Sequence, residues 1–463
     1  MWSMGERYVP AALQIISTLI LTRMILPSDF AEVALISVII ELLTLIISSG
    51  LADGLIYNNR NSNLLYSTVF YANIGLAISL YSLLVLSGGF ISNYYGIPRL
   101  RVLIYVVGLN LIFHALSYIH RTMYTVNLNF KTPAQIVFIS TIIGCVVGLI
   151  LAFNNFGVWA IVFQTLTINA SQAVLFWANN KWRPILNFSW KEIKIILPFS
   201  IRVFLNNLLQ SVYDNIYTLL LGKYQPAKFL GYYNRMQSVV YFATKNLSYS
   251  LGHVYYPMLS KIKENVDEVR KKYLMISRII TYISFPILVI LIGSGYDIIL
   301  LVLTEKWVGG YNVLCFLCFA YFFMPCIFIN DSYLKVLNQT KTLFYTGIMR
   351  KVFGITILMI TITTNMTIIL HGIIVTFFIE WMISSICISK YLNISVIKQI
   401  TNIFSNIFVN CIALLLIAFI NKQIDFVYLR LLVSLSVAMS LYALWPITLK
   451  TKVYNDIKAL INK

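Results

Sequence analysis

Polar side chains follow one face of a long apolar segment near the middle of the chain. Within residues 195–221, five of them recur at helical spacing: Arg202, Asn206, Gln210, Tyr213 and Tyr217. At about 100° per residue, these side chains fall within an arc of about 80° on a helix. A cation at the centre of a lipid-facing helix costs roughly 2.5–3.5 kcal/mol, so we expect this face to line water inside a membrane protein.

The next apolar segment repeats the pattern. Its shared polar face consists of Asn234, Ser238, Tyr241, Lys245 and Ser248. Exposing the cation-bearing faces of both helices to lipid would cost free energy twice. The two faces therefore predict a water-filled cavity within the bilayer.

Composition places the whole chain in the membrane. Of its 463 residues, 59% are hydrophobic and 11% are charged, whereas soluble proteins average about 25% charged residues. Apolar runs of about 17–25 residues have the length of a transmembrane helix. We expect an all-α polytopic membrane protein of about fourteen transmembrane helices, near residues 7–24, 32–49, 66–88, 102–119, 134–153, 156–177, 195–221, 230–253, 279–301, 312–333, 343–363, 367–390, 403–420 and 426–448.

Cations are unevenly distributed among the connecting loops. The net charge of +19 comes from 35 Lys and Arg against 16 Asp and Glu. If the N-terminus is cytoplasmic, the loops on that side hold more than twice as many cations as the opposite loops. This bias predicts that both termini are cytoplasmic, and it explains the basic charge without a nucleic-acid partner.

The sequence predicts an internal duplication that divides the chain after the sixth expected helix. The connection 179–194 carries two tryptophans among cations, a composition typical of a helix at the membrane surface. The segment Arg23–Phe30 has a cation, a proline and then a phenylalanine, and Lys223–Phe229 repeats this order after the seventh helix. Such repeats predict two lobes. We expect an N-terminal lobe, a C-terminal lobe, and two further helices with a tail, over residues 1–190, 191–400 and 401–463.

Short motifs along most of the chain resemble those of a known family. They are Leu21-Thr-Arg23-Met-Ile-Leu-Pro27-Ser-Asp29-Phe30, Ser49-Gly50-Leu51-Ala52-Asp53-Gly54, Leu221-Gly222-Lys223, Gly231-Tyr232-Tyr233-Asn234-Arg235, Tyr256-Pro257-Met258-Leu259-Ser260 and Leu303-Thr304-Glu305-Lys306-Trp307. Their order and spacing resemble the polysaccharide flippases of the multidrug/oligosaccharidyl-lipid/polysaccharide exporter superfamily, especially the colanic-acid and O-antigen repeat-unit branch. Ala31, Ala52 and Thr304 depart from that pattern, which usually has glycine there.

This resemblance implies a fold and a function. The fold is two six-helix lobes around a central cavity, plus two C-terminal helices. The function is to move undecaprenyl-diphosphate-linked oligosaccharide repeat units from the inner to the outer leaflet of the bacterial inner membrane by alternating access. The implied partners are this lipid-linked oligosaccharide, membrane lipids, and the polymerase and glycosyltransferases of the same pathway.

The polar residues suit such a substrate. Arginine and lysine make charge-assisted hydrogen bonds to diphosphate, so we expect Arg202, Lys245 and Arg235 to bind it. Sugar hydroxyls and sugar faces would contact the amides, hydroxyls and aromatic rings of Asn206, Gln210, Asn234, Ser238, Tyr213, Tyr217 and Tyr241. Alternatively, Arg202 and Arg235 lie near helix ends and extend to the membrane surface.

Charged residues inside other apolar runs leave two interpretations open. Arg350 and Lys351 either line the inner half of the cavity or belong to a helix that extends into the cytoplasm. The acids inside spans are Glu41, Asp214, Asp331 and Glu380. Asp214 either couples transport to H⁺ or Na⁺, or pairs with a cavity cation.

Two other classes of protein compete with the flippase. A membrane-embedded glycosyltransferase or polymerase typically has a large external loop with catalytic residues, and no loop here is long enough. A multidrug exporter of the same fold would need an acidic cavity, whereas these faces are cationic. The histidines lack metal-ligand spacing and no phosphate-binding loop is present, so we expect no metal, cofactor or enzymatic activity.

Overall fold

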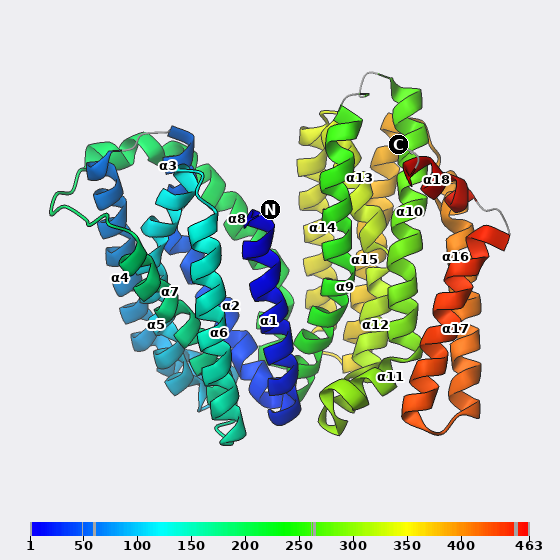
Figure 1. Ribbon diagram of the computed structural model, residues 1–463, viewed down its shortest axis with the longest axis horizontal. Coiled ribbons are helices and arrows are strands. Elements are labelled where there is room, and N and C mark those ends of the chain that lie inside the picture. The colour runs from blue at the N-terminus through cyan, green and yellow to red at the C-terminus, as the bar shows by residue number, and fades with distance from the viewer. Residues whose placement is uncertain are drawn as a thin grey trace. The chain divides into compact units, whose positions relative to one another are not determined.

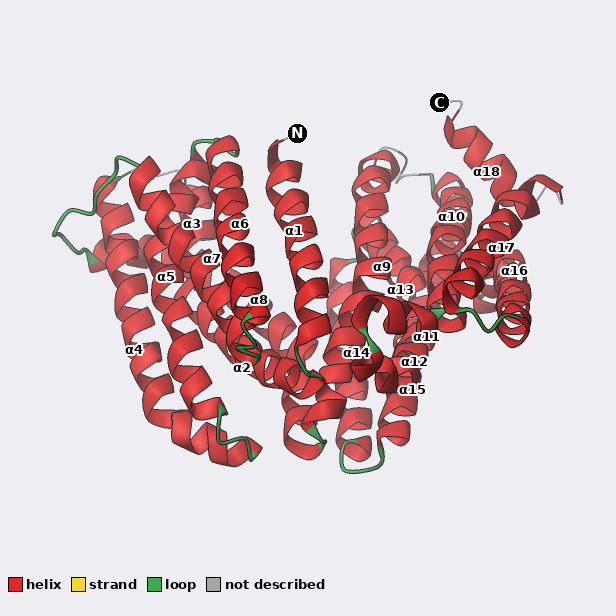
Figure 2. Ribbon diagram, turned by 60° about the horizontal axis from the view of Figure 1, so that its bottom comes forward, coloured by secondary structure: helices red, strands yellow, loops and turns green. Residues whose placement is uncertain are grey.

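The protein is built from helices. The computed structural model describes the backbone of residues 2–48, 50–58, 62–260, 262, 265–448 and 452–461. Side chains are described over the same ranges, except for residues 2–9, 11, 53, 56–58, 243, 245–258, 260, 447–448 and 457–461. The described residues form helices and short connections, with no strand among them (Figure 2). The expected all-α class is therefore confirmed.

Contacts divide the chain into two compact units, Met1–Gly231 and Tyr232–Lys463. Unit 1 holds helices α1 to α8 and the first residues of α9 (Figure 1). Their bounds are α1 Trp2–Met24, α2 Pro27–Ser48, α3 Leu51–Asn58, α4 Asn63–Tyr95, α5 Leu100–Val126, α6 Lys131–Phe153, α7 Val158–Asn179, α8 Trp190–Tyr224 and α9 Ala227–Ser260.

Unit 2 contains the rest of α9 and the remaining helices. Their bounds are α10 Val266–Gly293, α11 Gly295–Ile298, a π-helix Ile299–Leu303, a 3₁₀ helix Glu305–Gly310, α12 Tyr311–Tyr321, α13 Met324–Val336, α14 Thr340–Thr361, α15 Met366–Leu392, α16 Val396–Gln423, α17 Val427–Thr448 and α18 Lys452–Ile461. Within unit 2, the last turns of α9, the first turns of α10 and α18 lie at one end of the helices, and the α16–α17 connection lies at the other (Figure 1).

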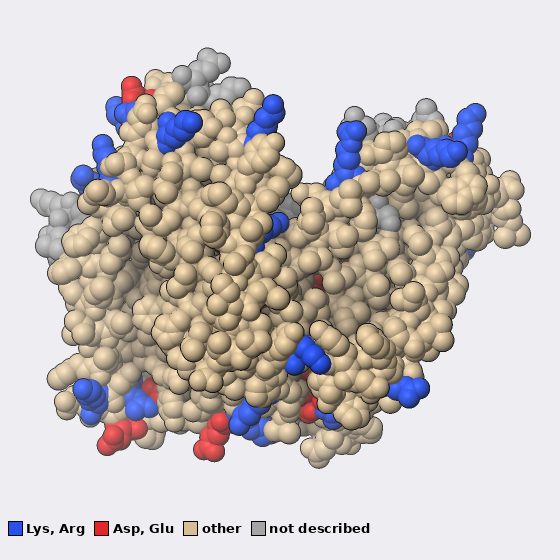
Figure 3. Space-filling view, turned by 180° about the vertical axis from the view of Figure 1, so that it is seen from behind, with Lys and Arg blue, Asp and Glu red and all other residues tan. Residues whose placement is uncertain are grey.

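All fourteen expected helices correspond to observed ones. Twelve described helical segments are long and apolar enough to cross a membrane, and α1 and α9 are the other two long helices. On the face drawn in Figure 3, most charged side chains lie near the ends of the helices, and uncharged side chains fill a broad band between them. The protein is therefore a multi-pass membrane protein.

Two details of the sequence interpretation are wrong. The surface helix expected over 179–194 does not form, because 180–189 is an extended connection tied to α4 by hydrogen bonds. The amides of Ile185 and Ser189 donate to the hydroxyls of Ser67 and Thr68, at 3.0 and 3.2 Å. Residues 254–278, which the expected helices 230–253 and 279–301 leave as a connection, are mostly helical, since α9 continues to Ser260 and α10 begins at Val266.

Each unit has its own apolar core. In unit 1 the core lies between α2, α4, α5 and α7, with Leu103 and Leu111 fully buried. In unit 2 it lies between α10, α13 and α15, with Tyr333 almost fully buried. The exits that carry the repeated motif are alike in length, since two residues separate α1 from α2 and α8 from α9.

Candidate functional site

The motif that contains Gly50 and Gly54 packs against α8 where its polar face begins. This helix contains Pro198, which removes one backbone hydrogen bond, and it bends across the end of unit 1 (Figure 1). A Cβ on Gly50 would lie 2.5 Å from the Ser200 carbonyl oxygen, and one on Gly54 would lie 2.4 Å from Ser200 Oγ. Gly50 also has a φ of +65°, which favours glycine. The glycines therefore let this motif pack against α8 two residues before Arg202.

The polar face of α8 is largely open. Arg202, Asn206 and Gln210 are exposed, and Arg202 and Asn206 make no hydrogen bond or ion pair with another described residue. Gln210 Nε2 donates to Asp214 Oδ1 at 2.8 Å, so Asp214 lies beside this polar face. Tyr213 and Tyr217 are half-buried beside them. A face on which Arg202 and the Asn206 amide make no bond to another described residue can bind anions and hydroxyl groups.

The polar face of α9 is described only in its first half. Asn234 is half-buried, and Ser238 is exposed, with its hydroxyl donating to the Asn234 carbonyl oxygen at 2.8 Å. Tyr241 is 37% exposed. The side chains of Lys245 and Ser248 lie outside the described residues.

Arg235 is positioned by two of the motifs, which pack on each other. The Tyr232 hydroxyl donates to the Lys306 carbonyl oxygen at 3.1 Å, and the Tyr232 ring meets the edge of Trp307 with centroids 6.1 Å apart. Trp307 is fully buried. A Cβ on Gly309 would lie 2.8 Å from the Tyr232 hydroxyl, so only glycine fits there without a shift. This contact fixes the first turns of α9, where Arg235 lies.

The Arg235 guanidinium has no protein partner among the described residues. The side chain is half-buried, and its Nε atom is shielded from solvent without a hydrogen bond. Leaving a buried charged donor unsatisfied costs more than leaving a neutral one unsatisfied. An anionic ligand at this position would remove that cost.

Arg350 has a different environment. It is only 8% exposed, and its Nη2 atom lies 3.0 Å from Asp331 Oδ2 on α13. Its neighbour Lys351 is half-buried. Arg350 can therefore bind a substrate only in competition with Asp331.

Glu41 on α2 is a polar contact that the sequence interpretation assigned no role. Its Oε1 atom accepts hydrogen bonds from Ser211 Oγ at 2.7 Å and from Asn215 Nδ2 at 3.3 Å, both on α8. The only available sequence signal was an acid inside an apolar run. Ser211 and Asn215 lie on the side of α8 away from Arg202, so they are not part of the polar face predicted from the sequence.

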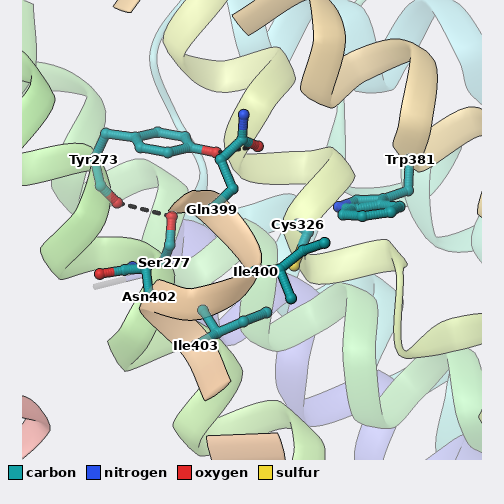
Figure 4. Close-up of a pocket in the computed structure, with 8 residues that line it drawn as sticks. All are labelled: Tyr273, Ser277, Cys326, Trp381, Gln399, Ile400, Asn402 and Ile403. Atoms are coloured by element: carbon teal, nitrogen blue, oxygen red, sulfur yellow. Dashed lines mark hydrogen bonds between the residues drawn. The ribbon is translucent and has the colours of Figure 1, made fainter. Parts of the chain in front are cut away.

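A small cavity in unit 2 does not have the size of a glycan site. Tyr273, Ser277, Cys326, Trp381 and Gln399 line it together with Ile400, Asn402 and Ile403 (Figure 4). Its volume of about 20 Å³ has room for about one water molecule. The Tyr273 hydroxyl donates to Asn330 at 2.7 Å, and Gln399 Nε2 donates to the Ser389 hydroxyl at 2.8 Å. This network holds α16 against α10, α13 and α15.

Comparisons with known proteins agree with the motifs. The teichuronic acid biosynthesis protein TuaB of Bacillus subtilis (strain 168) is 23% identical over 303 residues, 65% of this chain and 63% of that protein. The lipopolysaccharide biosynthesis protein WzxC of Escherichia coli (strain K12) is 23% identical over 68% of this chain and 65% of that protein. The match thus spans just under two thirds of the length of these relatives.

The fold is similar to that of a solved structure. The lipid II flippase MurJ in an inward closed conformation superposes with a TM-score of 0.72, at 15% identity, over 97% of this chain and 98% of that one. At that identity the likeness concerns the fold alone. The model of the family described as "Polysaccharide biosynthesis protein" matches residues 20–310, more than half of the chain, and the protein therefore belongs to this family.

Proposed function

We propose that the protein is a flippase for undecaprenyl-diphosphate-linked oligosaccharide repeat units. It would move them from the inner to the outer leaflet of a bacterial inner membrane by alternating access, with both of its termini in the cytoplasm. The proposal extends to this chain what the names of similar proteins state, namely lipopolysaccharide and teichuronic acid biosynthesis and lipid II flipping.

The observation that carries the proposal is the half-buried Arg235 on α9, which has no partner among the described residues. A diphosphate carries concentrated negative charge, and a guanidinium binds phosphate oxygens in a bidentate way. Arg202 is a second cation without a protein partner. Each arginine is thus available to an anionic ligand.

The remaining predicted site residues are assigned supporting roles. Asn206, Gln210, Asn234 and Ser238 would hydrogen-bond sugar hydroxyls, while Tyr213, Tyr217 and Tyr241 would stack on sugar faces. Lys245, Arg350 and Lys351 would contribute positive charge, Arg350 after release from Asp331. In this scheme Asp214 takes part in coupling to H⁺ or Na⁺, and the lobes of alternating access are residues 1–190 and 191–400, followed by 401–463.

The test is complementation in cells that need flipping for growth or surface polysaccharide. Arg235→Ala and Arg202→Ala should lower surface polysaccharide at least about tenfold, since hydrogen bonds to charged groups contribute roughly 1.5–3 kcal/mol each. Arg101→Ala is a matched control, because Arg101 is exposed and bonds to Tyr105 of its own helix at 2.7 Å. Full activity of both site variants at normal protein levels would refute the proposal.

A multidrug exporter and a membrane-embedded glycosyltransferase or polymerase are the alternatives. The first would bind cations, which the free Arg202 and Arg235 disfavour. The second would make or break a glycosidic bond. Purified protein that transfers sugar between lipid-linked acceptors would favour this alternative over the flippase.

A further inference from the structure

We infer that Glu41, Ser211 and Asn215 form a Na⁺ site within unit 1. The inference deepens the proposed function, on which it rests for its place in an ion-coupled cycle. It differs from the coupling role of Asp214, because the ligands come from two helices rather than from one.

Three side chains that each carry an oxygen ligand meet at one point, where Asn215 presents its Nδ2 atom and also donates to the Ser211 carbonyl oxygen at 3.0 Å. Glu41 Oε1 lies 2.7 Å from Ser211 Oγ and 3.3 Å from Asn215 Nδ2. Ser211 is 7% exposed, and its hydroxyl also lies 3.4 Å from Asn215 Nδ2. Carboxylate, hydroxyl and amide oxygens are the ligands that hard cations prefer.

The carboxylate of Glu41 is only partly satisfied. Both hydrogen bonds go to Oε1, and the described residues provide no partner for Oε2. Glu41 is exposed, and it lies fourteen residues after Pro27 in α2, about 21 Å along that helix. At this depth within a membrane span, an ionised carboxylate without a counter-ion is costly, so a cation is the expected occupant.

The ligand set favours Na⁺ over a proton. One negative charge neutralises one monovalent cation, and the two neutral oxygens would complete its coordination. A proton needs the carboxylate alone. Rotation of the Asn215 amide would turn its oxygen toward the ion, and the Ser211 hydroxyl would accept rather than donate.

The site joins α2 to α8, which gives Na⁺ a route to influence the substrate face. Asp214 and Gln210 bond to each other within α8, whereas Glu41 bonds across to α8 from another helix. Filling the site would replace the two hydrogen bonds with metal contacts. The position of α8, which also carries Arg202, would then depend on Na⁺.

The experiment measures Na⁺ binding to the full-length protein in detergent, without any glycan lipid. Thermal unfolding would be followed in NaCl, KCl and choline chloride at equal ionic strength. Wild type should show a melting temperature that rises with NaCl alone, because a ligand of the folded state stabilises it. Glu41→Gln should abolish this rise, and Ser211→Ala should raise the half-maximal Na⁺ concentration about tenfold.

Ser79→Ala is the matched control for Ser211→Ala. Ser79 lies in unit 1 and is exposed, and its hydroxyl donates to the Gly75 carbonyl oxygen of its own helix at 2.8 Å. The control should keep the wild-type Na⁺ response, and Asp214→Asn shows whether the Na⁺ response depends on Asp214 instead of Glu41. If Glu41→Gln does not fold, the shift in Ser211→Ala alone decides the test.

Three results would overturn the site: no Na⁺-specific rise in wild type, an unchanged rise in Glu41→Gln, or a rise lost only in Asp214→Asn. Since no substrate is present, failure here leaves the diphosphate proposal intact. Conversely, Na⁺ binding by a protein whose Arg235 and Arg202 variants remain fully active would refute the diphosphate proposal alone.

Discussion

Arg235 and Arg350 lie in long helices of the same unit, yet among the described residues only Arg350 has a carboxylate partner. Arg350 on α14 is paired with Asp331 on α13 at 3.0 Å. Arg235 on α9 has an Nε atom shielded from solvent and no partner among the described residues. An arginine paired across two helices holds them together, whereas an unpaired arginine is available to bind an anionic ligand.

The other arginines of unit 2 strengthen this contrast. Arg278 on α10 bonds to Asp456 on α18 at 2.6 Å, and Arg430 on α17 is paired with Asp297 on α11. In both pairs the carboxylate comes from a different helix, whereas Arg270 is paired with Asp267 of its own helix at 3.1 Å. The fold of unit 2 therefore satisfies its arginines with acids wherever the described residues permit, and Arg235 is the exception.

The largest predicted effect is on stability at the paired arginine. Arg350→Met should lower the free energy of unfolding by about 3–5 kcal/mol, because it leaves the Asp331 carboxylate uncompensated. Thermal unfolding in detergent would measure the loss. Arg350→Met combined with Asp331→Asn should recover most of it, and a double variant as unstable as the single one would show that the ion pair is unimportant.

Arg235→Met should have the opposite effect on stability. Removing an unpartnered, half-buried charge should leave the free energy of unfolding unchanged or raise it by about 1–2 kcal/mol, while transport falls at least about tenfold. The same melting experiment and the complementation assay would report the two quantities. A large loss of stability would mean that Arg235 has a structural partner, and the contrast with Arg350 would disappear.

Thr304→Gly tests the contrast between Arg235 and Arg350 by changing the segment that packs beside Arg235. Thr304 has a φ of +86° and a ψ of 171°, a conformation that suits glycine and strains a β-branched residue. It lies just before the segment that packs on Tyr232. We expect a gain of about 1 kcal/mol in stability with unchanged transport, measured in the same two assays. A destabilised variant would indicate that the threonine side chain makes a necessary contact.

The smallest stability effect is expected at the exposed arginine of unit 1. Arg202→Gln should change the free energy of unfolding by no more than about 0.5 kcal/mol, as is usual at an exposed position. Transport should still fall, because this guanidinium is available to substrate. If stability and transport are both unaffected, Arg202 serves only to anchor α8 at the membrane surface.

Hydrophobic length predicted the number and order of the spans, because each needs enough apolar residues to cross the bilayer whatever its neighbours are. The breaks inside spans were not predictable in the same way. Phe322 and Phe323 separate α12 from α13 although the whole run is apolar. Helix ends near 179–194 and 254–278 also differed, since polar residues suit both exposed helices and loops.

The site was predicted in part. Periodicity placed Arg202, Asn206 and Gln210 on one exposed face of α8, because side chains three and four residues apart share a helix face. Periodicity could not distinguish the unpaired Arg235 from the paired Arg350, since both are cations within or beside apolar runs. Glu41 was visible as an acid inside a span, but its partners Ser211 and Asn215 are 170 and 174 residues away.

The sequence by itself therefore determined a helical membrane protein, its spans, its family motifs, the polar face of α8 and the first half of the polar face of α9. All of these follow from local properties: apolar length, helical period and the order of short motifs. The tertiary structure alone decided which arginines are paired, that Glu41 contacts α8, and that two motifs pack together to place Arg235. Pairing depends on which helices are neighbours in space, and residue types along one chain do not state that.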